Sequence, residues 1–328
     1  MPHVGWRAWH RRDSIRGVGF SLVGFSLVVA GLVVAGLVVA ACGSEIATPT
    51  PSLPPTSLPP TSLPADGDET SAAGALVTVG NSAAASIPAV RVDPPPPTDC
   101  ESVAMAIATR DPKPRMQVIV RSTSWTDTVV TLEVATRTPA GWRCGPAMDA
   151  RVGRAGMRPL LERRSGDGTT PAGVFPLATM TAPDGQRFSF FGNSANPGVS
   201  AGAYRRVRPG DCFGATPNTP GYGHLRSDTS CSGPDDEYLP RFVAAYSNAA
   251  LIGANMEPEV SGDAPGEIPY AAAIFLHRHV YANGVSGSTK PTSGCVSLAQ
   301  IDLTNVLVGM TNDVVFVIGT TDWLLNPT

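Results

Sequence analysis

The segment from residue 43 to residue 99 sets the strongest limit on how this chain can fold. It consists mainly of Ala, Ser, Thr and Pro, contains the pentapeptide Ser-Leu-Pro-Pro-Thr at 52–56 and again at 57–61, and carries four consecutive prolines at 94–97. Such a segment has too few large apolar side chains to offset the entropy of ordering itself. We therefore expect a semi-stiff tether, with a reach below ~180 Å at about 3.1 Å per residue, and one folded unit after it.

Residues 1–41 are expected to form a signal peptide for export. Four arginines precede an uncharged stretch, 17–41, which ends in Val39-Ala40-Ala41 directly before Cys42. Small residues running into a cysteine resemble the lipobox that signal peptidase II cuts before the cysteine is lipidated. The alternative is an uncleaved membrane anchor, because the apolar stretch is long enough to span a bilayer. The predicted location is the cell membrane, with Cys42 as the lipid anchor and the protein facing the cell wall.

Composition and charge fit a soluble domain and exclude one class of partner. The chain is 42% hydrophobic and 16% charged, with a formal net charge of -3. It therefore lacks the basic footprint of a nucleic-acid-binding protein. We expect three parts, a signal peptide at 1–41, a lipidated Cys42 with its tether at 42–99, and a folded domain at 100–328, and we expect this domain to be monomeric.

The cysteine count indicates one free thiol. If Cys42 is lipidated, five cysteines remain in an oxidising compartment, and an odd number cannot all pair. Spacing alone does not assign the connectivity. Pairing of nearest neighbours would join Cys100 to Cys144 and Cys212 to Cys231 and leave Cys295 unpaired.

Short apolar and β-branched runs predict a mainly β domain. A hairpin region is expected early in the domain, and a buried strand near its end. Another apolar run, 271–276, leads directly into His277-Arg278-His279, so both histidines are expected at a strand end and on one face. The segments predicted as strands are 117–120, 129–134, 142–144, 249–254, 271–276 and 314–318.

One substantial helix is predicted after Cys295. Leu303, Val306, Leu307 and Met310 follow the spacing of a buried helical stripe. The run from Ser297 to Gln300 matches a capping box, which would place Cys295 two residues before the helix. A thiol in that position would be favoured as a thiolate by the helix dipole.

Two motifs together resemble the catalytic domain of the YkuD-type L,D-transpeptidases. One is the apolar strand that ends in His277, and the other is Thr292-Ser293-Gly294-Cys295 a short loop later. The Gly-rich segment 166–177 and the hairpin region 142–156 are also similar to this family and occur in the family's order. The likeness covers roughly residues 116 to 320.

The resemblance implies a β-sandwich-like fold and a cysteine-dependent acyltransferase without metal or organic cofactor. Cys295 would be acylated by the penultimate residue of a tetrapeptide stem of peptidoglycan, with release of the terminal D-alanine. A second stem's amine would then form a 3→3 crosslink. His277 would be the base, and the backbone carbonyl of Arg278 would orient it. The family is typically acylated by carbapenems.

Other residues near the motif are candidates for binding the substrate. Gly294 leaves room for backbone amides to approach an oxyanion, and Thr292, Ser293, Arg278 and His279 are expected at the substrate side.

The sequence departs from the common family pattern on both sides of the nucleophile. The residue two before it is usually His and is Ser293 here, and the usual Arg two after it is Ser297. Arg278 or Arg226 could supply the missing cation, and His224 could approach the same region.

Three functions remain open at this stage. The first is an L,D-transpeptidase, and the second is an L,D-carboxypeptidase, in which water replaces the acceptor amine. The third is a catalytically silent lipoprotein that binds the wall through the same fold.

The lipid anchor and the catalytic domain should be separable by mutation. Cys42→Ser should abolish lipidation and cleavage by signal peptidase II, because both need the cysteine, while activity in solution stays unchanged. Detergent partitioning measures the first effect. A variant that still partitions with lipid would favour the uncleaved anchor.

Overall fold

The structure is a computed structural model that describes residues 98–257, 260–262, 264, 266–282 and 288–326. The signal peptide, the lipidation residue Cys42 and all but the end of the tether lie outside these residues. In the described part, no helix combines the length and the apolar character needed to cross a membrane.

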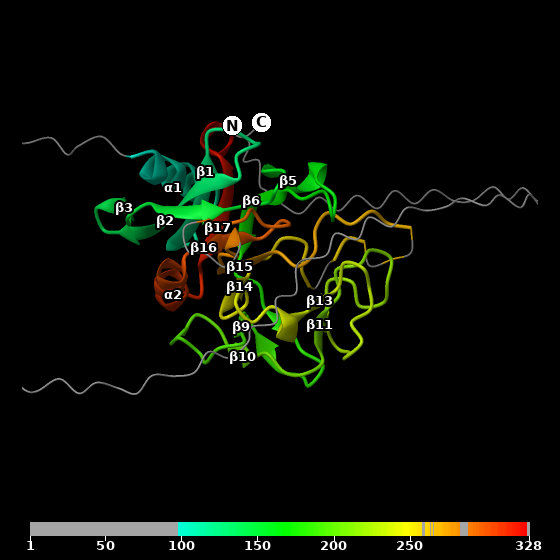
Figure 1. Ribbon diagram of the computed structural model, residues 1–328. Helices are drawn as coiled ribbons and strands as arrows, with labels where there is room; N and C mark the ends of the chain where they lie inside the picture. The colour runs from blue at the N-terminus through cyan, green and yellow to red at the C-terminus, as the bar shows by residue number, and fades with distance from the viewer. Residues whose placement is uncertain (1–97, 258–259, 263, 265, 283–287, 327–328) are drawn as a thin grey trace, which may run out of the picture. The chain divides into compact units, whose positions relative to one another are not determined.

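A large mixed sheet forms the centre of the described fold, with strand order β10-β9-β14-β15-β16-β4-β2-β1-β17-β6-β5 and β3 paired to β2 (Figure 1). The chain is therefore mainly β, as predicted. Its strands are β1 (Met116–Ser122), β2 (Val129–Thr138), β3 (Gly141–Cys144), β4 (Met148–Arg151), β5 (Met157–Pro159), β6 (Thr170–Pro176), β9 (Phe190–Gly192), β10 (Tyr204–Arg206), β14 (Ala249–Leu251), β15 (Phe275–Arg278), β16 (Val296–Leu298) and β17 (Val315–Thr320).

Helices cover both faces of the sheet because its central strands are apolar on both sides. In β1, Val118 and Val120 pack into the core that includes α2 (Gln300–Gly309), whereas Ile119 packs on the other face against α1 (Asp99–Arg110). This alternation follows from the two-residue period of a strand. A short helix, α3 (Thr321–Leu325), packs beside α1.

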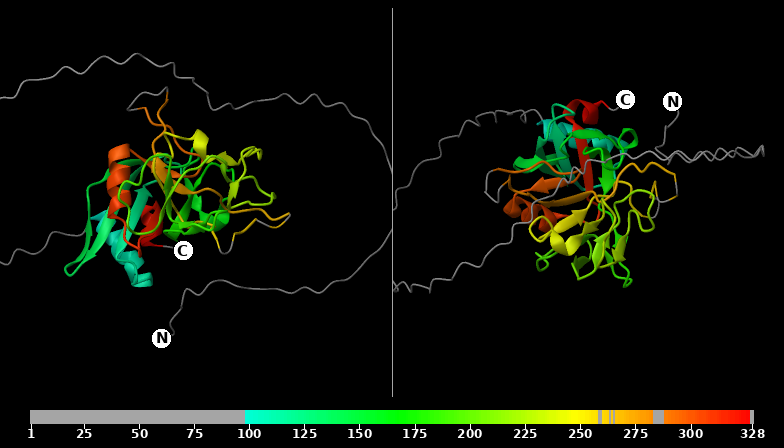
Figure 2. Two further views of the ribbon diagram at one scale, coloured as in Figure 1. Left: turned by 90° about the horizontal axis from the view of Figure 1, so that it is seen from below. Right: turned by 45° about the vertical axis from the view of Figure 1, so that its right-hand side comes forward.

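The segment between β6 and β15 builds a second apolar cluster beside β9 and β14. Two small sheets belong to this region, which Figure 2 shows in green and yellow, at the opposite end of the main sheet from α1 and α3. One sheet pairs β7 (Met180–Thr181) with β8 (Arg187–Phe188), and the other has the order β12 (Leu225–Ser227), β11 (Asp211–Phe213), β13 (Glu237–Tyr238). A 3-10 turn, η2 (Leu239–Arg241), follows β13, and another, η1 (Leu160–Glu162), lies earlier in the chain between β5 and β6.

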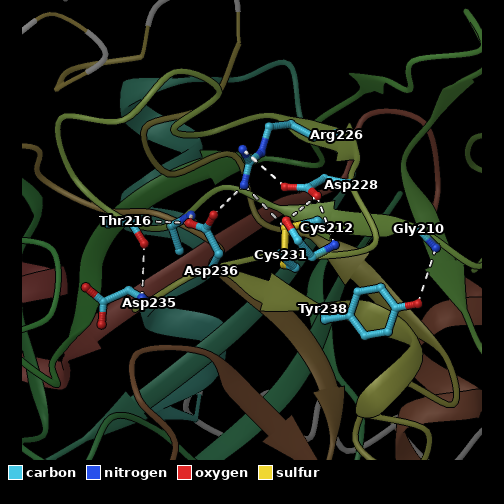
Figure 3. Close-up of a disulfide and its surroundings, with 11 residues drawn as sticks. Gly210, Cys212, Thr216, Arg226, Asp228, Cys231, Asp235, Asp236 and Tyr238 are labelled. Atoms are coloured by element: carbon cyan, nitrogen blue, oxygen red, sulfur yellow. Dashed lines mark hydrogen bonds and ion pairs between the residues drawn. A yellow bond between two sulfur atoms is a disulfide. The ribbon is translucent and has the colours of Figure 1, made fainter. Parts of the chain in front are cut away.

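The predicted cysteine pairing is confirmed. Disulfides join Cys100 to Cys144 and Cys212 to Cys231, and Cys295 is free and buried. The first bridge ties α1 to β3. The second holds the loop that follows β12 to β11, as Figure 3 shows.

Helix α1 was not predicted from the sequence. It begins at Asp99, at the end of the segment interpreted as tether, and its start is a capping box. The Thr98 hydroxyl accepts from the Glu101 amide at 3.2 Å, and the Glu101 carboxylate accepts from the Thr98 amide at 3.1 Å. The Thr-x-x-Glu pattern was the available signal.

The predicted capping box at Ser297 is wrong. Helix α2 begins at Gln300, its N-cap is Ala299, and no side chain caps it. Ser297 lies instead within β16, fully buried, because this segment pairs with β15 and β4 on either side. Cys295 is therefore separated from the helix by a strand, and the expected activation by the helix dipole falls away.

Candidate active site

The two candidate catalytic residues come from neighbouring parallel strands. Leu276 pairs with Val296 and His277 with Ser297, so β15 and β16 run side by side with Cys295 directly before β16. Extending this register places Cys295 opposite Phe275. Because residues two apart on a strand share a face, Phe275, His277 and Cys295 point to the same side of the sheet, toward the second apolar cluster.

The Cys295 thiol is bound to backbone groups of the preceding strand. Its Sγ donates to the Ala273 carbonyl at 3.1 Å and accepts from the Phe275 amide at 3.4 Å. Aromatic rings surround it, with Phe213 and Tyr246 packed edge-on against Phe275. The side chain is only 7% exposed, so these two backbone contacts hold the sulfur in a largely buried position.

The imidazole of His277 is fixed in one orientation. Its Nδ1 lies 2.6 Å from the carbonyl oxygen of Arg278, which only accepts, so Nδ1 carries the proton and Nε2 is left as the acceptor. Tyr246 packs edge-on against the ring at 5.4 Å. The role implied for the Arg278 backbone therefore has a matching contact.

His277 and Cys295 lie near each other, but their side chains are not hydrogen-bonded to each other. Strand spacing of ~4.8 Å and a two-residue offset of ~6.6 Å place their Cα atoms about 8 Å apart. Within the described residues, the bonds of the thiol go to backbone groups and not to the imidazole. Such catalytic contacts commonly close only when substrate is bound.

Burial keeps both groups neutral. It lowers the pKa of His277 to about 4, against the opposing bond to the Arg278 carbonyl. It also raises the pKa of the Cys295 thiol strongly, and the Glu237 carboxylate adds to that rise. The thiolate expected from the helix dipole is thus contradicted, and the resting pair is a neutral thiol and a neutral imidazole.

The turn before Cys295 is built by Thr292 and Gly294. The Thr292 hydroxyl donates to the Cys295 carbonyl at 2.6 Å and accepts from the Gly294 amide at 3.1 Å. Gly294 has φ +153°, and a Cβ there would lie 3.1 Å from the Thr169 carbonyl oxygen. Thr292 therefore shapes the turn, and its partner amide at Gly294 is already bonded and not free for an oxyanion.

A cavity of about 170 Å³, the Cys295 cavity, is lined in part by Cys295. It brings together five segments that are far apart in the sequence. Two predicted residues, Ser293 and Gly294, line it beside the cysteine. Its lining residues are Arg163, Ser165, Gly166, Ala215, Asp235, Glu237, Ala272, Ala273, Ile274, Ser293, Gly294 and Cys295.

Glu237 is a polar group of this cavity that the sequence did not point to. Burial raises its pKa to about 7, and it accepts a hydrogen bond from the Tyr246 hydroxyl. Tyr246 in turn contacts His277. A chain of contacts therefore runs from the cavity to the imidazole.

The Cys212–Cys231 disulfide and its neighbours position this acidic segment (Figure 3). Asp236 accepts from the backbone amides of Ala215 and Thr216 at 3.0 and 2.9 Å and pairs with Arg226. Asp235 and Glu237, on either side of it, line the cavity.

The same neighbourhood contains a group of possible metal ligands. In the described part of the chain, Cys212, Cys231 and Asp236 are the group close enough to share one. The disulfide occupies both sulfur atoms, and Asp236 is already bonded to Arg226. These residues do not fit a metal centre.

Several predicted residues lie outside the cavity lining. The His279 Nδ1 is 2.9 Å from the Ser297 hydroxyl, and both side chains are buried. The Arg278 guanidinium lies over the ring of Tyr281. Arg226 is paired with acidic side chains.

His224, the remaining candidate, is bonded to Glu257 and 41% exposed. It too lies outside the cavity lining. The cation in the cavity is Arg163, which sequence reasoning missed.

The comparisons with known proteins give no further identification. No protein-family model matches the chain, and no match is found among curated proteins. The likeness to the YkuD-type family therefore stays a prediction from the motifs.

Glu237 should make stability fall as the pH rises. Its pKa is about 7 in the folded protein, whereas the unfolded chain releases the proton near the ordinary glutamate pKa of 4.5. Between these values the folded state binds more protons, so its stabilisation is lost on raising the pH. The glutamine in Glu237→Gln does not titrate. The unfolding free energy of this variant, measured relative to wild type, should therefore rise by on the order of 3 kcal/mol between pH 4 and pH 8.

Urea unfolding across this pH range measures the difference. The opposing titration of His277 is common to both proteins and cancels. Glu162→Gln, at an exposed carboxylate, is the matched control and should run parallel to wild type. Parallel curves for Glu237→Gln would show that this carboxyl is ionised in the folded protein.

Proposed function

We propose that the protein is a cysteine-dependent acyltransferase of peptidoglycan, an L,D-transpeptidase that acts through Cys295 and His277. One observation carries the proposal. A free thiol lines a cavity, and an oriented imidazole with an available Nε2 lies on the same face of the adjacent strand. The sandwich-like YkuD fold and the export as a lipoprotein anchored through Cys42 belong to the same proposal.

The chemistry follows from the neutral resting state. As substrate enters the cavity, the thiol loses its bond to the Ala273 carbonyl, and Nε2 of His277 takes its proton while Sγ attacks the peptide carbonyl. The carbon–nitrogen bond breaks, and the leaving amine receives the proton back from His277. A thioester on Cys295 remains, and the amine of a second stem peptide resolves it.

Mass spectrometry of the intact protein tests this function. Incubation with a carbapenem should add one acyl group, located at Cys295 by peptide mapping, and Cys295→Ala should remain unlabelled. A separate sample that has not met the carbapenem should convert a disaccharide-tetrapeptide into a crosslinked dimer. Release of tripeptide alone would indicate a carboxypeptidase, and absence of any acyl adduct would indicate a catalytically silent wall-binding protein.

Two substitutions test whether His277 or His279 is the general base. His277→Ala should slow acylation of Cys295 at neutral pH by about 10²–10⁴-fold, the usual loss for a general base. His279→Ala should cost much less, because its ring is bonded to Ser297 away from the cavity. Intact mass against time gives both rates. Equal losses, or the reverse order, would show that His277 is the wrong choice.

A further inference from the structure

The Arg163 guanidinium is a buried cation that lines the Cys295 cavity and keeps one donor without a partner in the described part of the chain. The residue is 2% exposed, and its Nη1 is buried with no hydrogen-bond partner among the residues that the structure describes. Its Nε donates to the Thr169 hydroxyl at 3.3 Å, and its Nη2 lies 3.5 Å from an Asp167 oxygen. A buried donor without a hydrogen-bond partner costs free energy, so a ligand that accepts from this nitrogen would bind favourably.

Asp167 neutralises Arg163 only in part. Its carboxylate also accepts from the Thr169 hydroxyl at 2.6 Å and from the backbone amides of Arg164 and Thr169 at 3.0 and 2.8 Å. The contact to Arg163 is long in comparison. An arginine stays protonated in proteins even when burial opposes it, so positive charge remains available to an anion in the cavity.

The guanidinium lies beside the turn that carries the nucleophile. Nη2 is 3.6 Å from the position that a Cβ on Gly294 would take, and Gly294 directly precedes Cys295. In a peptide, the carboxylate of a terminal residue lies about one residue, ~3.8 Å, beyond the preceding carbonyl. A carbonyl placed at the sulfur would therefore bring the terminal carboxylate within reach of Arg163.

We propose that Arg163 binds the terminal carboxylate of the peptide that acylates Cys295, so that the site accepts chain ends and rejects internal peptide bonds. The planar fork of arginine suits a carboxylate, which accepts two parallel hydrogen bonds. The inference rests on the proposed function for the identity of the peptide, but the carboxylate site itself does not.

Among the described side chains that line the cavity, Arg163 is the only cation, so it is the source of any preference for anions there. The other ionisable groups there, apart from the thiol, are Glu237 and Asp235, both acidic. Removal of the arginine would thus leave a cavity that repels carboxylates. This makes the effect of a substitution large and easy to detect.

Two alkylating reagents of equal size test the site without requiring catalysis. Iodoacetate carries a carboxylate and iodoacetamide is neutral, and both modify Cys295 in the full-length protein. The ratio of their rates should fall on the order of 10- to 100-fold in Arg163→Gln, as expected for loss of a nearby opposite charge. Arg164→Gln, the exposed neighbour, is the control and should keep the wild-type ratio.

Arg163→Lys guards against a folding defect in the glutamine variant. It keeps the charge but not the fork, and should lower the ratio about threefold, the size of the net loss of one ordinary hydrogen bond. Circular dichroism confirms that each variant is folded. A wild-type ratio in either folded variant would overturn the proposal, and so would a wild-type thiol that neither reagent reaches.

A peptide assay separates this proposal from the function on which it rests. Wild type should turn over a tetrapeptide with a free terminal carboxylate far faster than the same peptide amidated at its end, and Arg163→Gln should lose the difference. Equal turnover of both peptides by wild type would remove the Arg163 site and leave the function standing. No turnover of either, with a changed alkylation ratio, would remove the function and leave the carboxylate site.

Discussion

The parallel pairing of β15 with β16 is the contact on which the rest of the site depends. It lies inside the main sheet, with β14 and β4 on its outer sides, and its register sets Cys295 and His277 on one face. The same burial that makes this strand pair part of the core removes water from both side chains. Stability and resting chemistry therefore have one cause, since the interior that packs the two groups also holds each of them neutral.

A neutral thiol and a neutral imidazole differ from a thiolate–imidazolium pair, because the thiol is still protonated when the substrate binds. In the proposed reaction a neutral thiol gives up its proton during attack, so a substrate that displaced the Ala273 carbonyl from Sγ would supply part of the activation. Few charged side chains line the cavity. Glu237 has its pKa raised and His277 has its pKa lowered, and Arg163 is the cation among the described residues that line the cavity of Cys295. Opposed shifts of this kind are typical of functional sites.

Much of the fold was readable from the sequence, because alternation and β-branched runs predict strands wherever tertiary packing agrees with them. The predictions at 117–120, 129–134 and 314–318 correspond to β1, β2 and β17. The errors concern helix starts, because the same capping-box pattern occurs at two places whose tertiary contacts differ. Ser297 and Gln300 satisfy the spacing of a capping box, but strand pairing takes the backbone of Ser297 and His279 takes its hydroxyl. The pattern that does cap a helix, Thr98 with Glu101, was assigned to the end of the tether.

The cation of the site could not be predicted for a related reason. In the family pattern it would stand two residues after the nucleophile, at Ser297, but here that side chain is fully buried and bonded to His279, not to the cavity. A cation that serves the cavity must then come from another element, and spacing along the chain does not show which one. Arg163 and Arg164 are adjacent and alike in sequence, yet one is buried and the other exposed. Only the folded turn of 163–170, closed by Asp167 and Thr169, decides that Arg163 faces the thiol.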